Sequence, residues 1–201
     1  MKGKITLLAG LFLILAGLLW YTAALHEAAR AAQAVKTVVP QLQQTVTTQL
    51  AQPEQEQVSK QKLLMTEYIV EGIGYIGVLE IPKLTLELPV ICSWSSENAK
   101  KAPCRYTGSV YDHNMILCAH NYKSHFGRLN QLEVGDAVYF IDLEGNQYSY
   151  QVKGAQLLEG TDVERIQEGD WDLTLFTCTP GGKMRYSVQC KRAASDSCKG
   201  G

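Results

Sequence analysis

The sequence has 201 residues, of which 46% are hydrophobic and 19% charged. That length suits one domain with short appendages, and this much apolar material excludes a wholly disordered chain. The formal net charge is −1, so no polybasic surface is present and we expect no nucleic-acid partner.

The first 25 residues predict a cytoplasmic tip and a transmembrane anchor (1–25). Residues 5–25 contain no charge, and at ~1.5 Å per residue a helix of that length spans a bilayer core. Lys2 and Lys4 precede the run, which predicts a single-pass protein of the cell membrane with its N-terminus inside and its catalytic domain extracytoplasmic. A cleaved signal peptide is the alternative, although its apolar core is usually shorter.

Residues 26–71 predict a stalk between the anchor and the body. The segment is rich in Gln and Ala, and Pro40 interrupts a weak helical spacing of apolar residues. We therefore expect a solvated spacer. A coiled-coil partner helix is the alternative, but sustained heptads are missing. At the other end of the chain, residues 194–201 are expected to be a polar tail.

Residues 72–193 predict an all-β body of antiparallel strands. Apolar and polar residues alternate over 84–90, 148–153 and 184–190, and short apolar runs fill 115–119, 137–143 and 173–178. Glu144-Gly145-Asn146 indicates a hairpin turn. Because no long amphipathic helix separates these strands, the pattern favours a barrel or a sandwich over a βαβ sheet.

Two of the apolar runs end close to residue types that carry chemistry. Cys178 ends one run, and after a Thr-Pro-Gly-Gly turn the chain returns through Arg185. A hairpin there places the guanidinium beside the thiol, where it favours the thiolate and can stabilise an oxyanion. His120 follows another run and can carry the proton of a leaving amine. On spacing alone this is a hypothesis, and a buried packing cysteine is its alternative.

These residues also carry a resemblance to a known family. The chain contains YIGVLEIPKLTLELPV at 75–90, then Ala-His-Asn at 119–121, then Thr-Leu-Phe-Thr-Cys at 174–178 and a strand bearing Arg185. In content and order this resembles the sortases, membrane-anchored cysteine transpeptidases of mainly Gram-positive bacteria. The resemblance covers about residues 72–192. It implies a closed β-barrel with short helices and loops, preceded by an N-terminal transmembrane helix and a stalk.

The resemblance implies a role for each candidate residue. Cys178 is the nucleophile, His120 the general acid and base, and Arg185 the residue that holds the oxyanion and positions substrate. Thr177 and Ala119 are the neighbouring substrate-binding residues. The thiolate attacks a Leu-Pro-x-Thr-Gly-like sorting signal of a surface protein, and the thioacyl enzyme passes that protein to an amine of a peptidoglycan precursor or a pilin Lys. No cofactor or metal is implied; some family members bind calcium, but no dense acidic loop indicates it here.

Other features bear on the choice of residues and on the subclass. Neither His113 nor His125 ends an apolar strand, so His120 is preferred to both. The chain has no Asp-Pro-aromatic tripeptide, which pilin-polymerising relatives often carry. About a dozen residues separate Leu158 from Trp171, too few for the long helix of class B relatives. Together these points favour a plain barrel in the manner of classes C, D or E, and an anchoring role over pilus assembly.

The remaining cysteines and two other functions stay open. We expect most of the five to be reduced packing residues, although an extracytoplasmic location permits disulfides (Cys92, Cys104, Cys118, Cys190 and Cys198). One alternative function is a secreted Cys-His hydrolase or protease, which would release its product to water. Another is a non-enzymatic zinc-binding module whose ligands would be Cys118, His120, Cys178 and Cys104.

Overall fold

The structure is a computed structural model that describes residues 64–193 and, nearer the N-terminus, residues 14–19, 21, 22, 26, 29, 33 and 38–43. In the continuous part, strands alternate with short helical elements: β1 (Tyr68–Val70), β2 (Ile73–Ile81), η1 (Pro82–Leu84), β3 (Leu86–Ile91), α2 (Ser96–Lys101), β4 (Cys104–Thr107), β5 (Met115–Cys118), η2 (Leu129–Gln131), β6 (Ala137–Asp142), β7 (Gln147–Glu159), α3 (Val163–Ile166), β8 (Leu173–Cys178) and β9 (Met184–Arg192).

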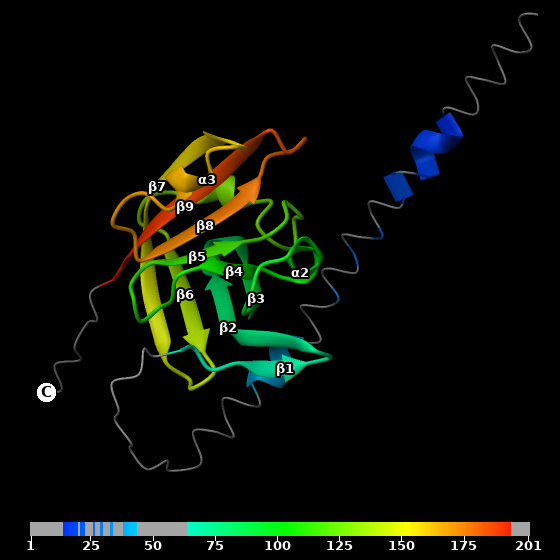
Figure 1. Ribbon diagram of the computed structural model, residues 1–201. Helices are drawn as coiled ribbons and strands as arrows, with labels where there is room; N and C mark the ends of the chain where they lie inside the picture. Colours follow the sequence, from blue (N-terminus) through cyan, green and yellow to red (C-terminus); the bar gives the residue numbers. More distant parts are fainter. Residues whose placement is uncertain are drawn as a thin grey trace, which may run out of the picture.

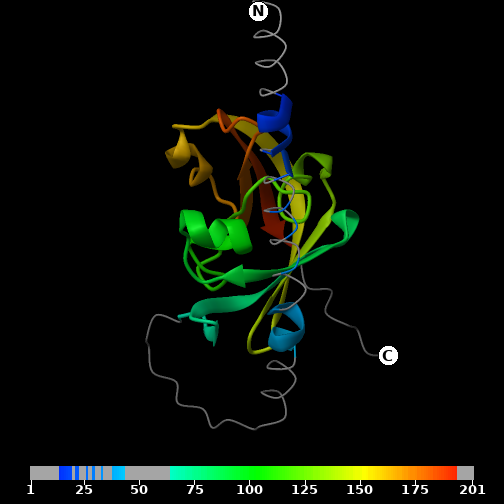
Figure 2. The same ribbon diagram turned by 90° about the vertical axis from the view of Figure 1, so that its right-hand side faces the viewer.

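The strands close into a barrel (Figure 1). Neighbours follow the order β2-β3-β4-β5-β8-β9-β7-β6, and β6 pairs back with β2 to complete the ring. β1 adds to the N-terminal end of β2 outside this ring. The short helices α2 and α3 lie outside the barrel wall, on the same flank (Figure 2). The expected all-β closed barrel with short helices and loops is confirmed.

The expectation of purely antiparallel strands is wrong at two pairings. β3 runs parallel to β4, and β5 runs parallel to β8, from Met115 opposite Leu173 to Cys118 opposite Phe176. Period-two alternation reports which face of a strand is buried, but it carries no information on the direction of the neighbouring strand. The parallel pairing has a consequence for the site, because β5 and β8 end at the same edge of the sheet.

The strand predicted at 84–90 begins two residues later than expected. Pro82 opens the 3₁₀ turn η1, which includes Leu84, and Thr85 has a left-handed φ of 51°. β3 therefore starts at Leu86, and within it Glu87 is the exposed residue, because neighbouring elements cover both faces of the strand. The other predicted strands are confirmed to within a few residues, apart from β7, which runs six residues past the predicted 148–153.

The barrel wall separates two apolar clusters. Leu117, Leu175 and Val188 belong to the interior cluster, whereas Cys118 and Phe176 belong to an outer cluster that also holds Ala99 of α2. Because successive side chains of a strand point to opposite faces, Phe176 and Cys178 share the outer face of β8, and the residue between them faces inward.

Part of the predicted stalk contacts the barrel. Residues 38–43 are helical, and Val38, Val39 and Leu42 are buried. Two of them pack in the outer cluster beside Tyr75 and Val78 of β2. The expectation of a fully solvated spacer is therefore wrong for this stretch, because its apolar side chains have a surface to cover.

The remaining predictions for the chain ends stay predictions. Most of the proposed anchor at 5–25 and the whole tail at 194–201 lie outside the described residues. Within the described ranges, no helix has the length and apolar character needed to cross a membrane.

The first strand begins at Tyr68, four residues before the predicted start of the catalytic body at 72.

Candidate active site

The parallel strands β5 and β8 bring His120 and Cys178 to one edge of the barrel. β5 ends at Cys118, two residues before the histidine, and β8 ends at the cysteine itself. The backbone N–H of Ala119 donates to the carbonyl of Phe176 at 3.3 Å, and the Thr177 hydroxyl donates to the carbonyl of Ala119 at 2.8 Å. These two bonds extend the pairing beyond the last ladder residue, so the two strand ends are held together.

The hairpin between β8 and β9 places Arg185 directly opposite Cys178. The turn is closed by the Thr179 N–H, which donates to the carbonyl of Met184 at 2.9 Å, and by the N–H of Gly182, which donates to the carbonyl of Thr179 at 2.8 Å. Gly182 has a φ of 74°, a conformation that glycine adopts at no steric cost. Opposed residues in an antiparallel pair point to the same face, so the guanidinium lies on the side of the thiol.

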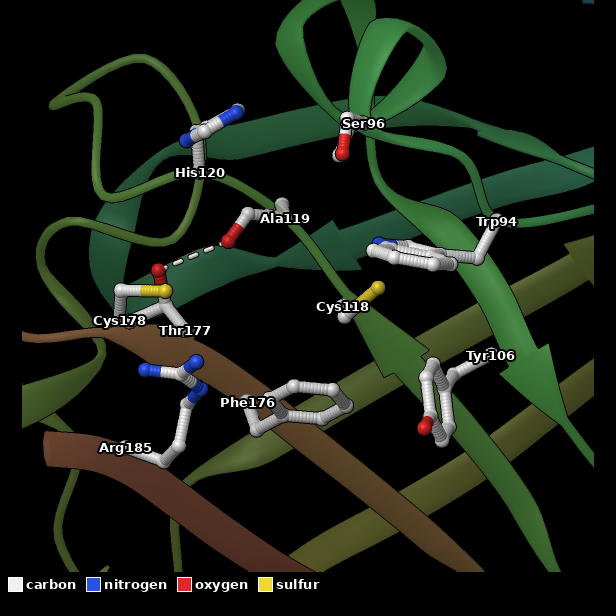
Figure 3. A pocket seen from close by; sticks show the side chains of 11 residues that line it. Trp94, Ser96, Tyr106, Cys118, Ala119, His120, Phe176, Thr177, Cys178 and Arg185 are labelled. Carbon is white, nitrogen blue, oxygen red and sulfur yellow. Dashed lines mark hydrogen bonds between the residues drawn. The ribbon is translucent and has the colours of Figure 1, made fainter. Parts of the chain in front are cut away.

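The Arg185 side chain is held by the turn that carries it. Its Nη1 donates to the carbonyl of Gly182 at 3.0 Å and to that of Met184 at 3.3 Å. Gly160, the residue after β7, packs against the Arg185 guanidinium. A Cβ at this position would stand 3.3 Å from Nη1. The Arg185 side chain reaches toward Cys178 at the pocket edge (Figure 3).

The His120 ring stacks on the ring of Tyr122, with centroids 5.3 Å apart and planes inclined by 23°. The carbonyl of His120 accepts the N–H of Phe126 at 3.3 Å, which folds the following loop back on the histidine. Tyr122 was not singled out from the sequence. Its position two residues after the histidine in a loop gave no periodic signal that would have identified it.

The other two histidines of the barrel do not line this pocket. His125 is fully buried and lies against Tyr122, with ring centroids 5.6 Å apart. His113 lies near the start of β8, the end opposite Cys178, where its ring nitrogens approach Asp172 and Arg192 at 3.5 Å. Of the histidines in residues 64–193, His120 alone lines the pocket that Cys178 lines.

All five residues predicted for the site line one pocket of about 300 Å³: Cys178, His120, Arg185, Thr177 and Ala119. Figure 3 shows Cys178 between His120 and Arg185 at one end of it, with Trp94 and Tyr106 at the other end. The roles of these residues remain proposals.

An aromatic wall, which the sequence did not reveal, lines the end of the pocket away from Cys178. The ring of Tyr106 meets Trp94 at a centroid distance of 5.9 Å and Phe176 at 5.5 Å, both edge to face. Phe176 could have been identified from its position two residues before Cys178 on the same face of a strand. Trp94 lies in the loop between β3 and α2 and Tyr106 lies on β4, so the folded chain brings them together. This end of the pocket suits an apolar substrate group.

The five cysteines that the structure describes are free thiols with different surroundings. Burial raises the pKa of Cys104 and of Cys190 to about 12, and burial raises the pKa of Cys118 further still. Cys118 also lines the pocket, yet it is 4% exposed. Cys178 is half-buried and opens onto the pocket.

Comparisons with known proteins show the family to which the chain is similar. The family model of the sortase domain matches residues 79–193. Sortase D of Bacillus subtilis (strain 168) is 26% identical over 125 residues, which cover 58% of this chain and 63% of the relative. Sortase A of Bacillus anthracis is 31% identical over 121 residues, which cover 56% of this chain and 57% of the relative. The chain thus spans about three fifths of the length of these curated relatives.

Solved structures share the fold. Sortase C1 of Streptococcus agalactiae superposes with a TM-score of 0.54 and 27% identity, covering 64% of this chain and 72% of that one. Sortase C of Streptococcus pneumoniae superposes with a TM-score of 0.54 and 24% identity, covering 78% of this chain and 90% of that one. At 24% identity, the likeness to the Streptococcus pneumoniae structure concerns the fold alone.

We predict that Thr177→Val destabilises the protein, because the carbonyl of Ala119 loses its side-chain donor in a buried place. The expected cost is about 1–3 kcal/mol in the free energy of unfolding, measured by urea denaturation. Thr177→Ser keeps the hydroxyl and is the matched control. Equal stability of the valine variant and the wild type would contradict a structural role for this bond.

We also predict that iodoacetamide at pH 8 alkylates Cys178 in the native protein well before Cys104, Cys118 and Cys190. The thiolate is the reactive form, and a thiol whose pKa is raised to about 12 is ionised in about one molecule in 10⁴ at pH 8. Peptide mass spectrometry at several times measures each site, and denatured protein serves as the control. Alkylation of the buried thiols at the rate of Cys178 would contradict the burial described here.

Proposed function

The chain belongs to the sortase family, and we propose that it is a cysteine transpeptidase that cleaves a sorting signal and transfers the attached protein to an amine. The observation that carries the proposal is the meeting of Cys178, His120 and Arg185 in one pocket with an apolar far end. A nucleophile, a proton carrier and a fixed cation are the groups that acyl transfer requires.

The first step of the proposed reaction forms a thioester. The Cys178 thiolate attacks the carbonyl carbon between Thr and Gly of a Leu-Pro-x-Thr-Gly-like signal, and the carbonyl oxygen becomes an oxyanion. The carbon–nitrogen bond then breaks, His120 gives a proton to the leaving amine, and the signal stays bound as a thioacyl enzyme. The aromatic wall around Tyr106 suits the apolar residues that precede the scissile bond.

Arg185 is proposed to stabilise the oxyanion. The turn fixes its position through the two bonds from Nη1, which leaves further guanidinium N–H groups for the substrate. A donor that is already in position stabilises the developing oxyanion without having to reorient. This stabilisation is largest where water is excluded. The same cation lies on the face of β8 from which the thiol projects.

The second step releases the product to an amine. A primary amine, from a peptidoglycan precursor or a pilin Lys, attacks the thioester carbon while His120 accepts its proton, and the sulfur–carbon bond breaks. We propose that the substrates are surface proteins bearing a C-terminal sorting signal and that the predicted N-terminal helix keeps the enzyme at the membrane. In that arrangement the barrel is extracytoplasmic.

Two other functions have less support. A Cys-His hydrolase would use the same groups and release product to water, so the ratio of ligated to hydrolysed product distinguishes it. A zinc-binding module would need clustered ligands, and among the described residues no group of three or more His, Cys, Asp or Glu side chains is arranged to hold a metal ion. Sortases need no cofactor, which agrees with a mechanism built from side chains alone.

We predict the effect of removing each proposed catalytic group on turnover of a quenched Leu-Pro-x-Thr-Gly peptide by the full chain. Cys178→Ala is expected to abolish the thioacyl adduct seen by intact mass. His120→Ala is expected to lower kcat/KM by about 10²–10⁴, and Arg185→Ala by about 10²–10³.

The control is His113→Ala, which removes a histidine at the opposite end of β8 and should keep near wild-type turnover. Undiminished turnover in Cys178→Ala would overturn the assignment of the nucleophile. Hydrolysis of the signal peptide at the same rate with and without an added amine, and with no ligated product, would favour the hydrolase.

A further inference from the structure

Two buried cysteines lie directly opposite each other in the barrel wall. Cys104 begins β4, Cys118 ends β5, and the two residues are partners in the antiparallel β4–β5 register. Opposed residues of an antiparallel pair point to the same face of the sheet, and both side chains belong to the outer apolar cluster. They are 0% and 4% exposed. The two thiols are therefore neighbours on one face, shielded from solvent.

The spacing of an opposed pair is also that of a disulfide. The Cα atoms of opposed residues in antiparallel strands lie about 4.5–5.5 Å apart, and disulfides form over Cα separations of about 4.4–6.8 Å. In the structure both residues are free thiols, and Sγ of Cys104 donates a weak hydrogen bond to the carbonyl of Ala102 at 3.4 Å. Rotation about the Cα–Cβ bonds therefore brings the two sulfurs together with little movement of either strand.

The pKa values of the two thiols reflect their burial and their proximity. Burial is the main reason why the pKa of Cys118 is raised, and the neighbouring Cys104 and Cys178 raise it further. Burial also raises the pKa of Cys104 to about 12. Such thiols react slowly while the barrel is folded. A disulfide at this place therefore forms as the chain folds, when both sulfurs are still accessible.

The other described cysteines are less well placed to pair with these two. Cys118 opposes Phe176 in the parallel β5–β8 register, so Cys178 lies two residues further along its strand. With strands about 4.8 Å apart and a rise of about 3.3 Å per residue, that offset separates the two Cα atoms by about 8 Å, beyond the reach of a disulfide. Cys190 belongs to the interior cluster and Cys92 packs against it, so the barrel wall separates both from the pair.

The pair lies at a weakly joined part of the ring of strands. β4 is four residues long, it shares a single register pair with β3, and its register with β5 shifts between Arg105 and Thr107. A covalent bond between β4 and β5 strengthens the ring at this place. It also connects two sides of the pocket, because β4 carries Tyr106 and β5 leads to His120.

We propose that Cys104 and Cys118 are the site of a structural cross-strand disulfide, which joins β4 to β5 and leaves Cys178 free. Disulfides persist outside the cytoplasm, where the barrel is proposed to lie. The inference does not depend on the transpeptidase reaction.

The oxidant in this step is itself a disulfide, either of a small molecule or of a protein. One cysteine thiolate attacks it, a mixed disulfide forms and one thiol leaves; the second cysteine then attacks the sulfur of the first, and the second thiol leaves. The chain loses two protons and two electrons, and the sulfur–sulfur bond of the oxidant is reduced to two thiols.

The test is refolding of the full chain in detergent micelles with reduced and oxidised glutathione, followed by alkylation with N-ethylmaleimide and digestion with trypsin. Arg105 directly follows Cys104, so trypsin cuts between the two cysteines and a disulfide joins the peptides 102–105 and 106–123. We expect this linked pair in most molecules, with Cys178 alkylated in its own peptide, 166–183. Full chain quenched in acid directly from the expressing cells is mapped in the same way and decides the question if refolding fails.

A second measurement tests the structural role of the bond. We expect the oxidised protein to have a Tm about 5–10 °C above that of the protein kept in dithiothreitol. Cys104→Ala and Cys118→Ala should each remove this difference, and either variant suffices if the other does not fold. The matched control is Cys190→Ala, which truncates a buried thiol of the interior cluster and should keep both the linked peptides and the difference in Tm.

Three results would contradict the inference. Alkylation of both thiols after oxidation and unfolding would show that no bond forms between them. A linkage of Cys118 to Cys178 would overturn the choice of partner and the offset described for β5 and β8. Equal Tm values of the oxidised and reduced protein, with the linked peptides present, would overturn the structural role of the bond.

Discussion

The parallel pairing of β5 with β8 is the constraint on which the rest of the site depends. Two parallel neighbours end at the same edge of a sheet, so a residue just past β5 and the last residue of β8 become neighbours although 58 positions separate them. The hydroxyl of Thr177, bonded to the carbonyl of Ala119, continues this pairing beyond the ladder. The barrel supports the arrangement, because β4 and β9 flank the pair and prevent the two strands from slipping. The positions of His120 and Cys178 are therefore a property of the sheet rather than of flexible loops.

The part of the site that depends on local structure was predictable from the sequence. Cys178 and Arg185 are joined by a short turn with two glycines, and a hairpin with that spacing makes them opposite residues whatever the rest of the fold. The strand bounds of β8 follow from its unbroken apolar run in the same way. His120 is different, because its approach to Cys178 requires a parallel contact between distant strands. Periodicity does not encode strand direction, so the sequence pattern alone made the approach of His120 to Cys178 a hypothesis. The resemblance to a known family added the order of the motifs.

What the sequence did not reveal depends on surfaces that exist only after the barrel has closed. Tyr106 of β4 meets Phe176 of β8 because β5 pairs with both strands in the barrel wall, and Trp94, in the loop before α2, meets Tyr106. Val38 and Leu42 are buried for a similar reason, since β2 offers them an apolar surface on its outer side. The strand predicted at 84–90 was placed too early because Pro82 and the left-handed Thr85 add a 3₁₀ turn, which alternation of apolar residues does not register.

A strand that ends at its nucleophile provides access from two sides. Within a strand, each side chain faces one layer, and a cysteine in the middle of β8 would meet either the outer pocket or the barrel interior. At the last residue the sheet no longer separates the two layers, so a hollow of about 380 Å³ lined by Tyr186 and the pocket lined by Phe176 both border Cys178. A transfer reaction with two substrates needs such an arrangement, because the acyl group must stay bound while a second molecule approaches the same carbon. A hydrolase has no such need, since water enters through any opening. Access from two sides is therefore a geometric property of the strand end, and it is compatible with the transfer proposed above.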